Sequence, residues 1–215
     1  MRPFILSALL VVGACVQPSR ETVQLAAELR RAPEGAQAMA MADRPVDCAI
    51  RDRACVTLWM VRGAACARLA ETSQEARRRN CAVEAFGRAA ELTPADAPAT
   101  ERAEPAIRLA EALERRRDRA MGEARRADNA AILAAVAPLG GPTAGYAAHY
   151  AAGVGINRVV AGDIPAGARC AALAEAAATL GGAAGAPGLP AIDDRIAQRR
   201  ASLQAAHDAQ QPECR

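Results

Sequence analysis

The chain has 215 residues, of which 52% are hydrophobic but only 2% aromatic, and its formal net charge is +3. A charge this close to neutrality gives no indication of a nucleic-acid partner, because nucleic-acid-binding domains usually carry a strongly basic surface. Much of the hydrophobic fraction is alanine, the strongest helix former, whereas the β-branched and aromatic residues that strands favour are scarce. The composition therefore predicts an all-α protein with few large side chains in its core.

The first fifteen residues, MRPFILSALLVVGAC, have the layout of a signal peptide. Arg2 provides a positive start, and the apolar run from Phe4 to Val12 is too short to span a bilayer as a mature helix. The four residues Val12-Gly13-Ala14-Cys15 resemble the lipobox of bacterial lipoproteins. The resemblance implies that residues 1–14 are removed, that the Cys15 thiol carries diacylglycerol, and that its amine is acylated, for example by palmitate.

Ordinary secretion is the alternative, because Val12 and Ala14 also suit a plain cleavage site. The seven cysteines favour lipidation, since one acylated cysteine leaves six that can pair. By resemblance to lipoprotein sorting rules, Val16 and Gln17 carry no signal for retention in the inner membrane. We therefore expect residues 15–19 to be a tether on the outer membrane, facing the oxidising periplasm, where disulfides persist.

Helices are then predicted from Ser19 to about Arg31, weakly from Ala36 to Ala42, and from about Asp52 to Glu71. Trp59 lies on the apolar stripe of the third helix and is interpreted as its hydrophobic anchor, with a groove aromatic as the alternative. On one continuous helix, Cys48 and Cys55 would lie roughly 10 Å apart, too far for a disulfide. A bond between these two cysteines therefore requires a break in the helix, and their pairing stays open.

The stretch from Arg62 to Asp96 is typical of two helices folded back on each other, and it resembles a tetratricopeptide repeat. With Gly63 as the first position of a 34-residue unit, small, apolar, aromatic and proline residues match the repeat pattern at Leu69, Ala70, Ala82, Phe86, Ala89 and Pro94. The sequence departs from the pattern at Cys66 and Ser73, where larger residues are usual. The resemblance implies two closely packed helices with Phe86 filling the gap between them.

The turn of this hairpin has two alternative registers. Thr72 and Glu75 have the spacing of a capping box, in which the Thr72 hydroxyl accepts a hydrogen bond from the Glu75 N–H, and this places the turn near Thr72. The repeat pattern instead places the turn near Arg77. Only the first register brings Cys66 opposite Cys81, within the Cα separation of about 7 Å that a disulfide allows. We expect the first register and a Cys66–Cys81 disulfide.

Further helices are predicted after this hairpin. The stretch from Thr93 to Pro105 contains three prolines and is expected to be a loop. The helical pattern from Ala106 to Val136 predicts two helices, or one helix bent near residues 119–122. The Pro/Gly-rich stretch 138–142 is the clearest boundary, and it divides a helical-hairpin domain from a second hairpin with a C-terminal helix, residues 20–138 and 142–211.

The stretch from Gly145 to Leu180 is the predicted second hairpin. Tyr146 and Tyr150 are one helical turn apart, and Gly162-Asp163 supplies the turn before an alanine-rich return helix. This arrangement again resembles a tetratricopeptide repeat, in a looser register. The predicted fold is therefore a set of antiparallel helical hairpins, arranged either as a tetratricopeptide-like stack or as a compact helical bundle closed by disulfides.

The C-terminal part is predicted to be a flexible linker, residues 181–190, followed by an amphipathic helix from Ala191 to Ala209. Cys214 in the tail can pair with Cys170, the other cysteine of the second half. A disulfide between them would hold this last helix against the second hairpin.

No catalytic motif is present in the sequence: there is no CxxC, HExxH, GxSxG or Walker pattern. His149 is interpreted as a packed helix histidine rather than as a base or metal ligand, and His207 has even less context. We expect no enzymatic activity, no metal and no cofactor. The arginine clusters 77–79, 115–117 and 125–126 are interpreted as solvated helix faces paired with nearby glutamates, rather than as sites for nucleic acid or lipid headgroups.

Two functions remain as hypotheses. The first is a lipid-anchored scaffold or adaptor for an envelope protein partner, which predicts an open groove with Trp59, Tyr146 and Tyr150 as candidate groove aromatics. The second is a small-ligand-binding or cell-wall-associated periplasmic lipoprotein without enzymatic activity, which predicts an enclosed apolar pocket.

Overall fold

A computed structural model describes residues 20, 23–24, 27–28, 42–44, 46, 48–73, 75–211 and 214. Within these residues the protein is all-α, as predicted, and contains no strand. The elements from residue 53 onward are α3 (Arg53–Ser73), α4 (Ala76–Leu92), α5 (Ala99–Arg117), α6 (Gly122–Val136), the short 3-10 helix η1 (Gly141–Thr143), α7 (Ala144–Val160), α8 (Ala166–Gly181) and α9 (Asp193–Ala209).

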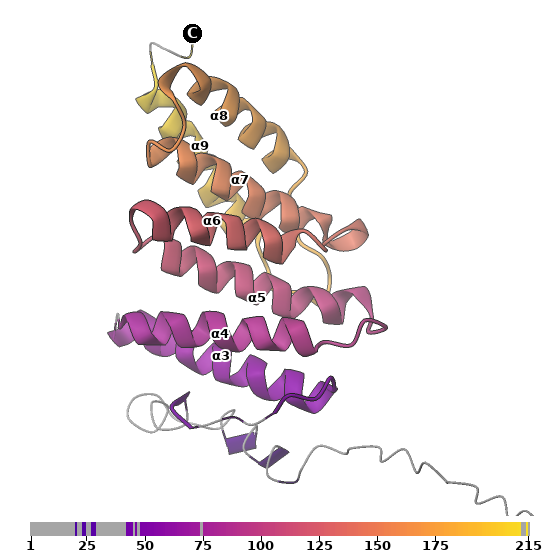
Figure 1. The fold of residues 1–215 in the computed structure, drawn as a ribbon. Coiled ribbons are helices and arrows are strands. Elements are labelled where there is room, and N and C mark those ends of the chain that lie inside the picture. Colours follow the sequence, from indigo (N-terminus) through magenta and orange to yellow (C-terminus); the bar gives the residue numbers. More distant parts are fainter. Residues whose placement is uncertain are drawn as a thin grey trace, which may run out of the picture.

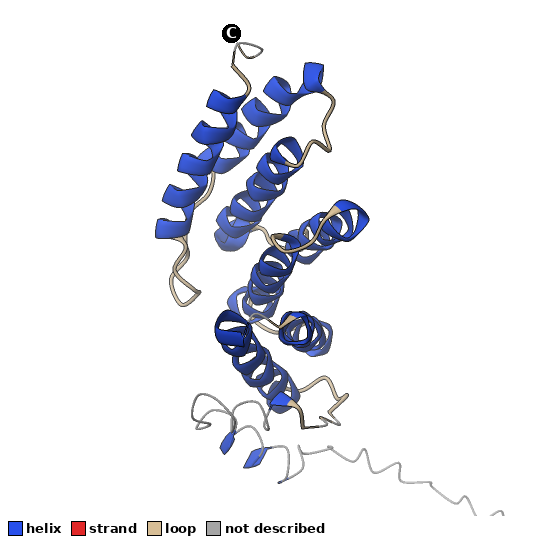
Figure 2. Cartoon of the chain, turned by 90° about the vertical axis from the view of Figure 1, so that its left-hand side faces the viewer, coloured by secondary structure: helices blue, strands red, loops and turns tan. Residues whose placement is uncertain are grey.

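The helices form three stacked hairpins, α3–α4, α5–α6 and α7–α8, with α9 packed against α7 and α8 (Figure 1). Each hairpin also packs on the next, through α4 with α5 and α6 with α7, so that the three hairpins form one continuous stack (Figure 2). The first helices of the hairpins begin at residues 53, 99 and 144, so successive hairpins begin 46 and 45 residues apart. The hairpin architecture is therefore present, but its units are longer than the expected 34 residues because the helices extend to 15–21 residues.

Close packing within the first hairpin depends on Gly63 and Phe86. A Cβ atom at Gly63 would lie only 2.6 Å from Cε1 of Phe86, so the aromatic ring packs directly on the backbone of α3. Phe86 is buried together with Ala82 and Ala89, the small residues on either side of it on α4. This packing explains in physical terms the small-and-aromatic pattern seen in the sequence.

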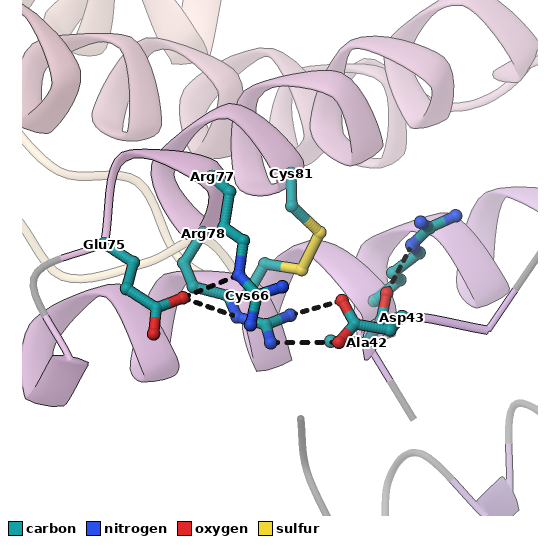
Figure 3. Close-up of a disulfide and its surroundings, with 8 residues drawn as sticks. Ala42, Asp43, Cys66, Glu75, Arg77, Arg78 and Cys81 are labelled. Carbon is teal, nitrogen blue, oxygen red and sulfur yellow. Dashed lines mark hydrogen bonds and ion pairs between the residues drawn. A yellow bond between two sulfur atoms is a disulfide. The ribbon is translucent and has the colours of Figure 1, made fainter. Parts of the chain in front are cut away.

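The turn of the first hairpin lies between Ser73, the last residue of α3, and Ala76, the first residue of α4, close to the register near Thr72. The expected capping box is absent, because Thr72 and Ser73 are the last residues of α3 and their hydroxyls donate back to the Leu69 carbonyl, at 3.2 and 2.8 Å. The Glu75 N–H donates instead to Ser73 Oγ, at 3.4 Å. Cys66 and Cys81 form a disulfide across this hairpin, with a Cα–Cα distance of 5.8 Å (Figure 3).

Cys48 and Cys55 also form a disulfide, with Cα atoms 5.6 Å apart. The bond is feasible because α3 begins only at Arg53, so Cys48 lies in the non-helical stretch before it. Asp52 Oδ1 accepts a hydrogen bond from the Cys55 N–H at 2.7 Å and thereby caps the start of α3. The indole N–H of Trp59 donates to the Cys48 carbonyl at 2.8 Å, which fixes the loop on the helix.

The prediction of a loop up to Pro105 is wrong. The non-helical segment ends at Pro98, and Pro105 lies inside α5. Proline has no N–H to donate to the Glu101 carbonyl one turn earlier, a loss that normally disfavours it in a helix. Its ring is fully buried, and this burial against the neighbouring helices offsets the loss.

The predicted break after α5 is confirmed, because residues 118–121 separate α5 from α6. At the Pro/Gly-rich stretch 138–142, η1 leads directly into α7. One buried cluster joins residues from both sides of this stretch: Ile107, Ile132, Tyr146, Leu180 and Ile196 are among its members.

A glycine turn and a disulfide connect the last three helices. Gly162 has φ +75° and makes the turn between α7 and α8 as expected. Cys170 on α8 and Cys214 in the tail form the third disulfide, with Cα atoms 5.3 Å apart.

The predicted signal peptide, Cys15 and the tether lie outside the described residues, as do most residues of the two helices expected before Cys48. In the part of the chain that is described, no helix combines the length and the hydropathy needed to cross a bilayer.

The packing of Phe86 on α3 generates a testable prediction. Gly63→Ala places a methyl group against the buried Phe86 ring and should lower the free energy of unfolding by about 1–2 kcal/mol, despite the higher helix propensity of alanine. The control is Gly87→Ala on α4, where the nearest atom is 4.0 Å from the new Cβ, and this variant should be unchanged or stabilised by up to about 1 kcal/mol. Urea unfolding with the disulfides intact measures both. Equal effects of the two substitutions would contradict the packing described.

Candidate functional site

A groove of about 730 Å³ runs between α3 and α5, the first helices of neighbouring hairpins. Its floor includes Phe86 of α4, the helix that packs against both α3 and α5. Its apolar lining consists of Val56, Met60, Val61, Ala64 and Ala67 on α3 and of Pro105 and Ala112 on α5. A smaller hollow of about 430 Å³ continues from it toward Asp118 and Arg119, so the depression extends along most of α5.

Ion pairs bridge the groove near both of its ends. Arg53 of α3 pairs with Glu101 of α5 at 3.1 Å, and Glu71 of α3 pairs with Arg115 of α5. All four side chains are at least partly exposed, so each pair contributes less than about 1 kcal/mol. Together they fix the relative placement of the two helices: the start of α3 faces the start of α5, and the ends face each other, so the helices run in the same direction.

The groove lining has balanced charge, with four arginines and four glutamates: Arg53, Arg68, Arg108, Arg115, Glu71, Glu101, Glu104 and Glu111. Arg108 pairs with Glu111 at 3.3 Å, and Glu111 also accepts from Arg115 at 2.9 Å. Arg68 and Glu104 are exposed, and neither forms an ion pair or side-chain hydrogen bond with another described residue.

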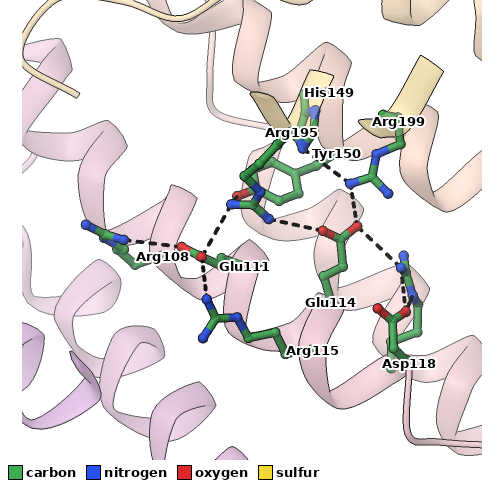
Figure 4. Close-up of polar contacts among 10 residues, drawn as sticks. Arg108, Glu111, Glu114, Arg115, Asp118, His149, Tyr150, Arg195 and Arg199 are labelled. Carbon is green, nitrogen blue, oxygen red and sulfur yellow. Dashed lines mark hydrogen bonds and ion pairs between the residues drawn. The ribbon is translucent and has the colours of Figure 1, made fainter. Parts of the chain in front are cut away.

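Behind the groove, α5 carries a buried carboxylate, Glu114, that joins three arginines (Figure 4). Arg199 of α9 donates to it at 2.7 Å, Arg195 of α9 at 3.2 Å, and Arg117 of α5 itself at 3.3 Å. Burial alone would raise the pKa of the Glu114 carboxyl, but the three guanidinium groups together hold this pKa below its ordinary value. Glu114 therefore stays ionised and ties α9 to α5.

α7 contributes His149 and Tyr150 to the same cluster. The Arg199 guanidinium donates to His149 Nε2 at 3.2 Å, and Arg195 donates to the Tyr150 hydroxyl at 3.2 Å. Burial, and then the positive charges of Arg199 and Arg195, lower the pKa of His149 to about 4. The imidazole is therefore neutral at pH 7 and serves as a hydrogen-bond acceptor.

Arg199 reaches this cluster across α7 because of Gly153. A Cβ atom at Gly153 would lie 2.5 Å from the guanidinium carbon of Arg199. Any larger residue at this position would displace the arginine, so Gly153 allows the contact between α9 and α5.

Ion pairs connect the Glu114 cluster to the groove. Arg195 of α9 contacts not only Glu114 but also Glu111 at 3.4 Å, and Glu111 accepts from Arg115 (Figure 4). Arg115 in turn pairs with Glu71 of α3. A continuous path of charged side chains thus links α9 through α5 to α3. The contacts of α5 with α9 and with α3 together fix the orientation of α5, and this orientation sets the shape of the groove.

The three candidate groove aromatics do not line the groove. Trp59 is 6% exposed, and Tyr146 and Tyr150 are fully buried. The Tyr146 hydroxyl donates to the Pro190 carbonyl at 2.5 Å, and the Tyr150 hydroxyl accepts from Arg195. For Trp59 the hydrophobic-anchor interpretation is correct, because helical spacing places all three rings on the inward faces of their helices.

The interpretation of the arginine clusters as solvated faces is wrong for several members. Arg78 is 1% exposed and donates two hydrogen bonds to Asp43, which fixes residues 42–43 on the first hairpin (Figure 3). Arg117 is buried beside Glu114, and Arg116 and Arg125 pair with Asp128 and Asp163. Carboxylates of the chain itself bind these cations.

Sequence reasoning missed the groove residues on α5. Glu101 and Glu104 were assigned to a proline-rich loop, although Glu101, Glu104, Arg108, Glu111 and Arg115 have the three- and four-residue spacing of one helix face. It also missed two of the three arginine partners of Glu114, which lie 81 and 85 residues further along the chain.

Neither a metal site nor a relative identifies the function. Among the described residues, no group of three or more His, Cys, Asp or Glu side chains is arranged to hold a metal ion. No family model matches the chain, and comparisons with curated proteins and with solved structures find no match.

The environment of His149 generates a prediction for pH dependence. Because folding lowers its pKa from 6.5 to about 4, the unfolded chain binds this proton more readily, and stability falls as pH drops through this window. The free energy of unfolding should decrease by about 2 kcal/mol between pH 7 and pH 5. Urea unfolding at both pH values measures this difference.

The two histidines allow a matched control. His149→Gln should remove this pH dependence, whereas His207→Gln, at the half-exposed histidine near the end of α9, should retain it. A slope that persists in His149→Gln would show that other groups cause it.

Proposed function

We propose that the chain is a lipid-anchored cell-envelope scaffold that binds a protein partner in the groove between α3 and α5. The observation that carries this proposal is the groove itself, formed by the first helices of two stacked hairpins. Stacked helical hairpins generally present such surfaces to peptides and proteins.

The chemistry of the groove favours a protein over a small apolar ligand. An apolar-ligand site encloses its ligand in mostly apolar walls with few polar groups. Here the apolar floor around Met60 and Phe86 is bordered by eight charged side chains on two parallel helices. An apolar centre with a polar rim is the usual anatomy of a protein interface.

The cysteines support export and lipidation. Three disulfides use six of the seven cysteines, and the seventh is Cys15 in the lipobox-like sequence. Disulfides of this kind persist in the periplasm and are rare in reducing compartments. With its thiol acylated, Cys15 would anchor the chain to the outer membrane, and the helical hairpins would face the periplasm.

Photo-cross-linking in cells tests this function. A photoreactive amino acid at Ala64, exposed on α3 in the groove, should give an adduct with one discrete envelope protein on illumination. The same amino acid at Ala174, exposed on α8 and outside the groove, should give no such adduct. Mass spectrometry of the adducts identifies the partner.

Cys15→Ser provides the control for the anchor. This variant lacks the thiol that lipidation requires, so it should leave the membrane fraction and lose the Ala64 adduct. Equal adducts from Ala64 and Ala174, or an adduct joining Ala64 to the same chain, would contradict the proposal. An unchanged membrane fraction for Cys15→Ser would contradict the lipid anchor alone.

A further inference from the structure

We propose that the partner segment bound in this groove has an apolar stretch flanked by one basic and one acidic residue, which pair with Glu104 and Arg68. This inference rests on the proposed function and specifies the chemistry of the ligand. The observation behind it is that most charged side chains of the groove pair with one another, whereas Arg68 and Glu104 do not.

Six of the eight charged groove residues already have partners within the groove. Arg53 pairs with Glu101, Arg108 with Glu111, and Arg115 with both Glu71 and Glu111. These side chains neutralise each other and hold the groove in shape. Arg68 and Glu104 are the two lining charges without an ion pair to a described residue, so they are free to bind a ligand.

The unpaired charges lie near opposite ends of the groove. Glu104 is one turn after Glu101, whose pair with Arg53 bridges one end, and Arg68 is one turn before Glu71, whose pair with Arg115 bridges the other. Counted along α5 or along α3, the rise of an α-helix, about 1.5 Å per residue, places them roughly 12–18 Å apart along the groove. The groove therefore has a negative end and a positive end.

The floor between these ends is apolar, whereas Arg108 and Glu111, which pair with each other, line its α5 side. Met60, Val61 and Ala64 of α3 line this floor, together with the largely buried Phe86 and Pro105. Each large apolar side chain of a ligand that is buried here contributes about 1.5–3 kcal/mol, which provides the affinity. The two charges select among ligands, because a like charge placed against either one is disfavoured.

A protein segment fits this pattern better than other anionic or cationic ligands. An anionic lipid surface or a nucleic acid would place negative charge against Glu104, and a polycation would place positive charge against Arg68. A polypeptide can present both signs around an apolar stretch. A separation of roughly 12–18 Å corresponds to about four to six residues of extended chain or about eight to twelve residues of helix.

Selection from a random peptide library against the full mature chain in lipid nanodiscs tests the inference. The wild-type protein should enrich peptides with a basic residue on one side of an apolar stretch and an acidic residue on the other. Arg68→Glu should shift the enriched peptides to basic residues on both sides, and Glu104→Arg should shift them to acidic residues on both sides. Either reversal should weaken the binding of a wild-type-selected peptide by about tenfold.

Exposed charges outside the groove supply the controls. Glu84→Arg on α4 and Arg158→Glu on α7 should leave the enriched peptides unchanged. A change of preference, rather than a loss of binding, cannot arise from misfolding. Failure to enrich any peptide, enrichment without a charge pattern, or a pattern that ignores Arg68→Glu and Glu104→Arg would overturn the inference.

The outcomes also separate this inference from the proposed function. A partner cross-linked at Ala64, together with peptides that show no charge preference, would uphold the scaffold and overturn the charge pattern. A charge pattern that follows the variants, with no partner cross-linked in cells, would uphold the peptide site and overturn the scaffold.

Discussion

The buried carboxylate of Glu114 is the interaction on which the arrangement of the helices depends. It lies on α5 and joins arginines of α9 to the middle hairpin, with His149 and Tyr150 of α7 completing the cluster. A buried charge is stable only when it is paired, and removal of one partner typically costs about 3–5 kcal/mol. This cluster fixes one face of α5 against α7 and α9. The neighbouring face of α5 is then presented to α3 and forms a wall of the groove.

The groove exists because packing is close within a hairpin and looser between the first helices of neighbouring hairpins. Gly63 lets Phe86 lie directly on the backbone of α3, so α3 and α4 approach closely. α3 and α5 are bridged instead by long charged side chains over an apolar floor.

Alanine-rich helices bury few large side chains, so disulfides are important to such a core. The bond that closes the longest loop, between Cys170 and Cys214, stabilises the fold by about 2–4 kcal/mol in the usual range for such bonds.

The helical hairpins could be predicted from local sequence patterns, whereas the groove and the Glu114 cluster could not. Apolar spacing around Phe86, the break near residues 119–122 and the Gly162 turn are encoded within a few residues, and the structure contains each of them. Pro105 was misplaced because its burial, which only tertiary packing supplies, outweighs its local preference. Spacing along one helix predicts the pair of Glu114 with Arg117 but not its pairs with Arg195 and Arg199, which lie on another helix. The lipid anchor at Cys15 stays a prediction from sequence resemblance.

Oxidative footprinting in intact membranes tests most directly whether the groove is occupied by a partner. Met60 lies in the groove, and Met121, which is 82% exposed at the start of α6, supplies an internal reference outside it. With a partner in the groove, Met60 should be oxidised more slowly in native membranes than in the purified, lipid-reconstituted protein, while Met121 should react at the same rate in both. Equal oxidation of Met60 in the two preparations would show that the groove is unoccupied in the cell envelope, and would contradict the proposed binding of a partner there.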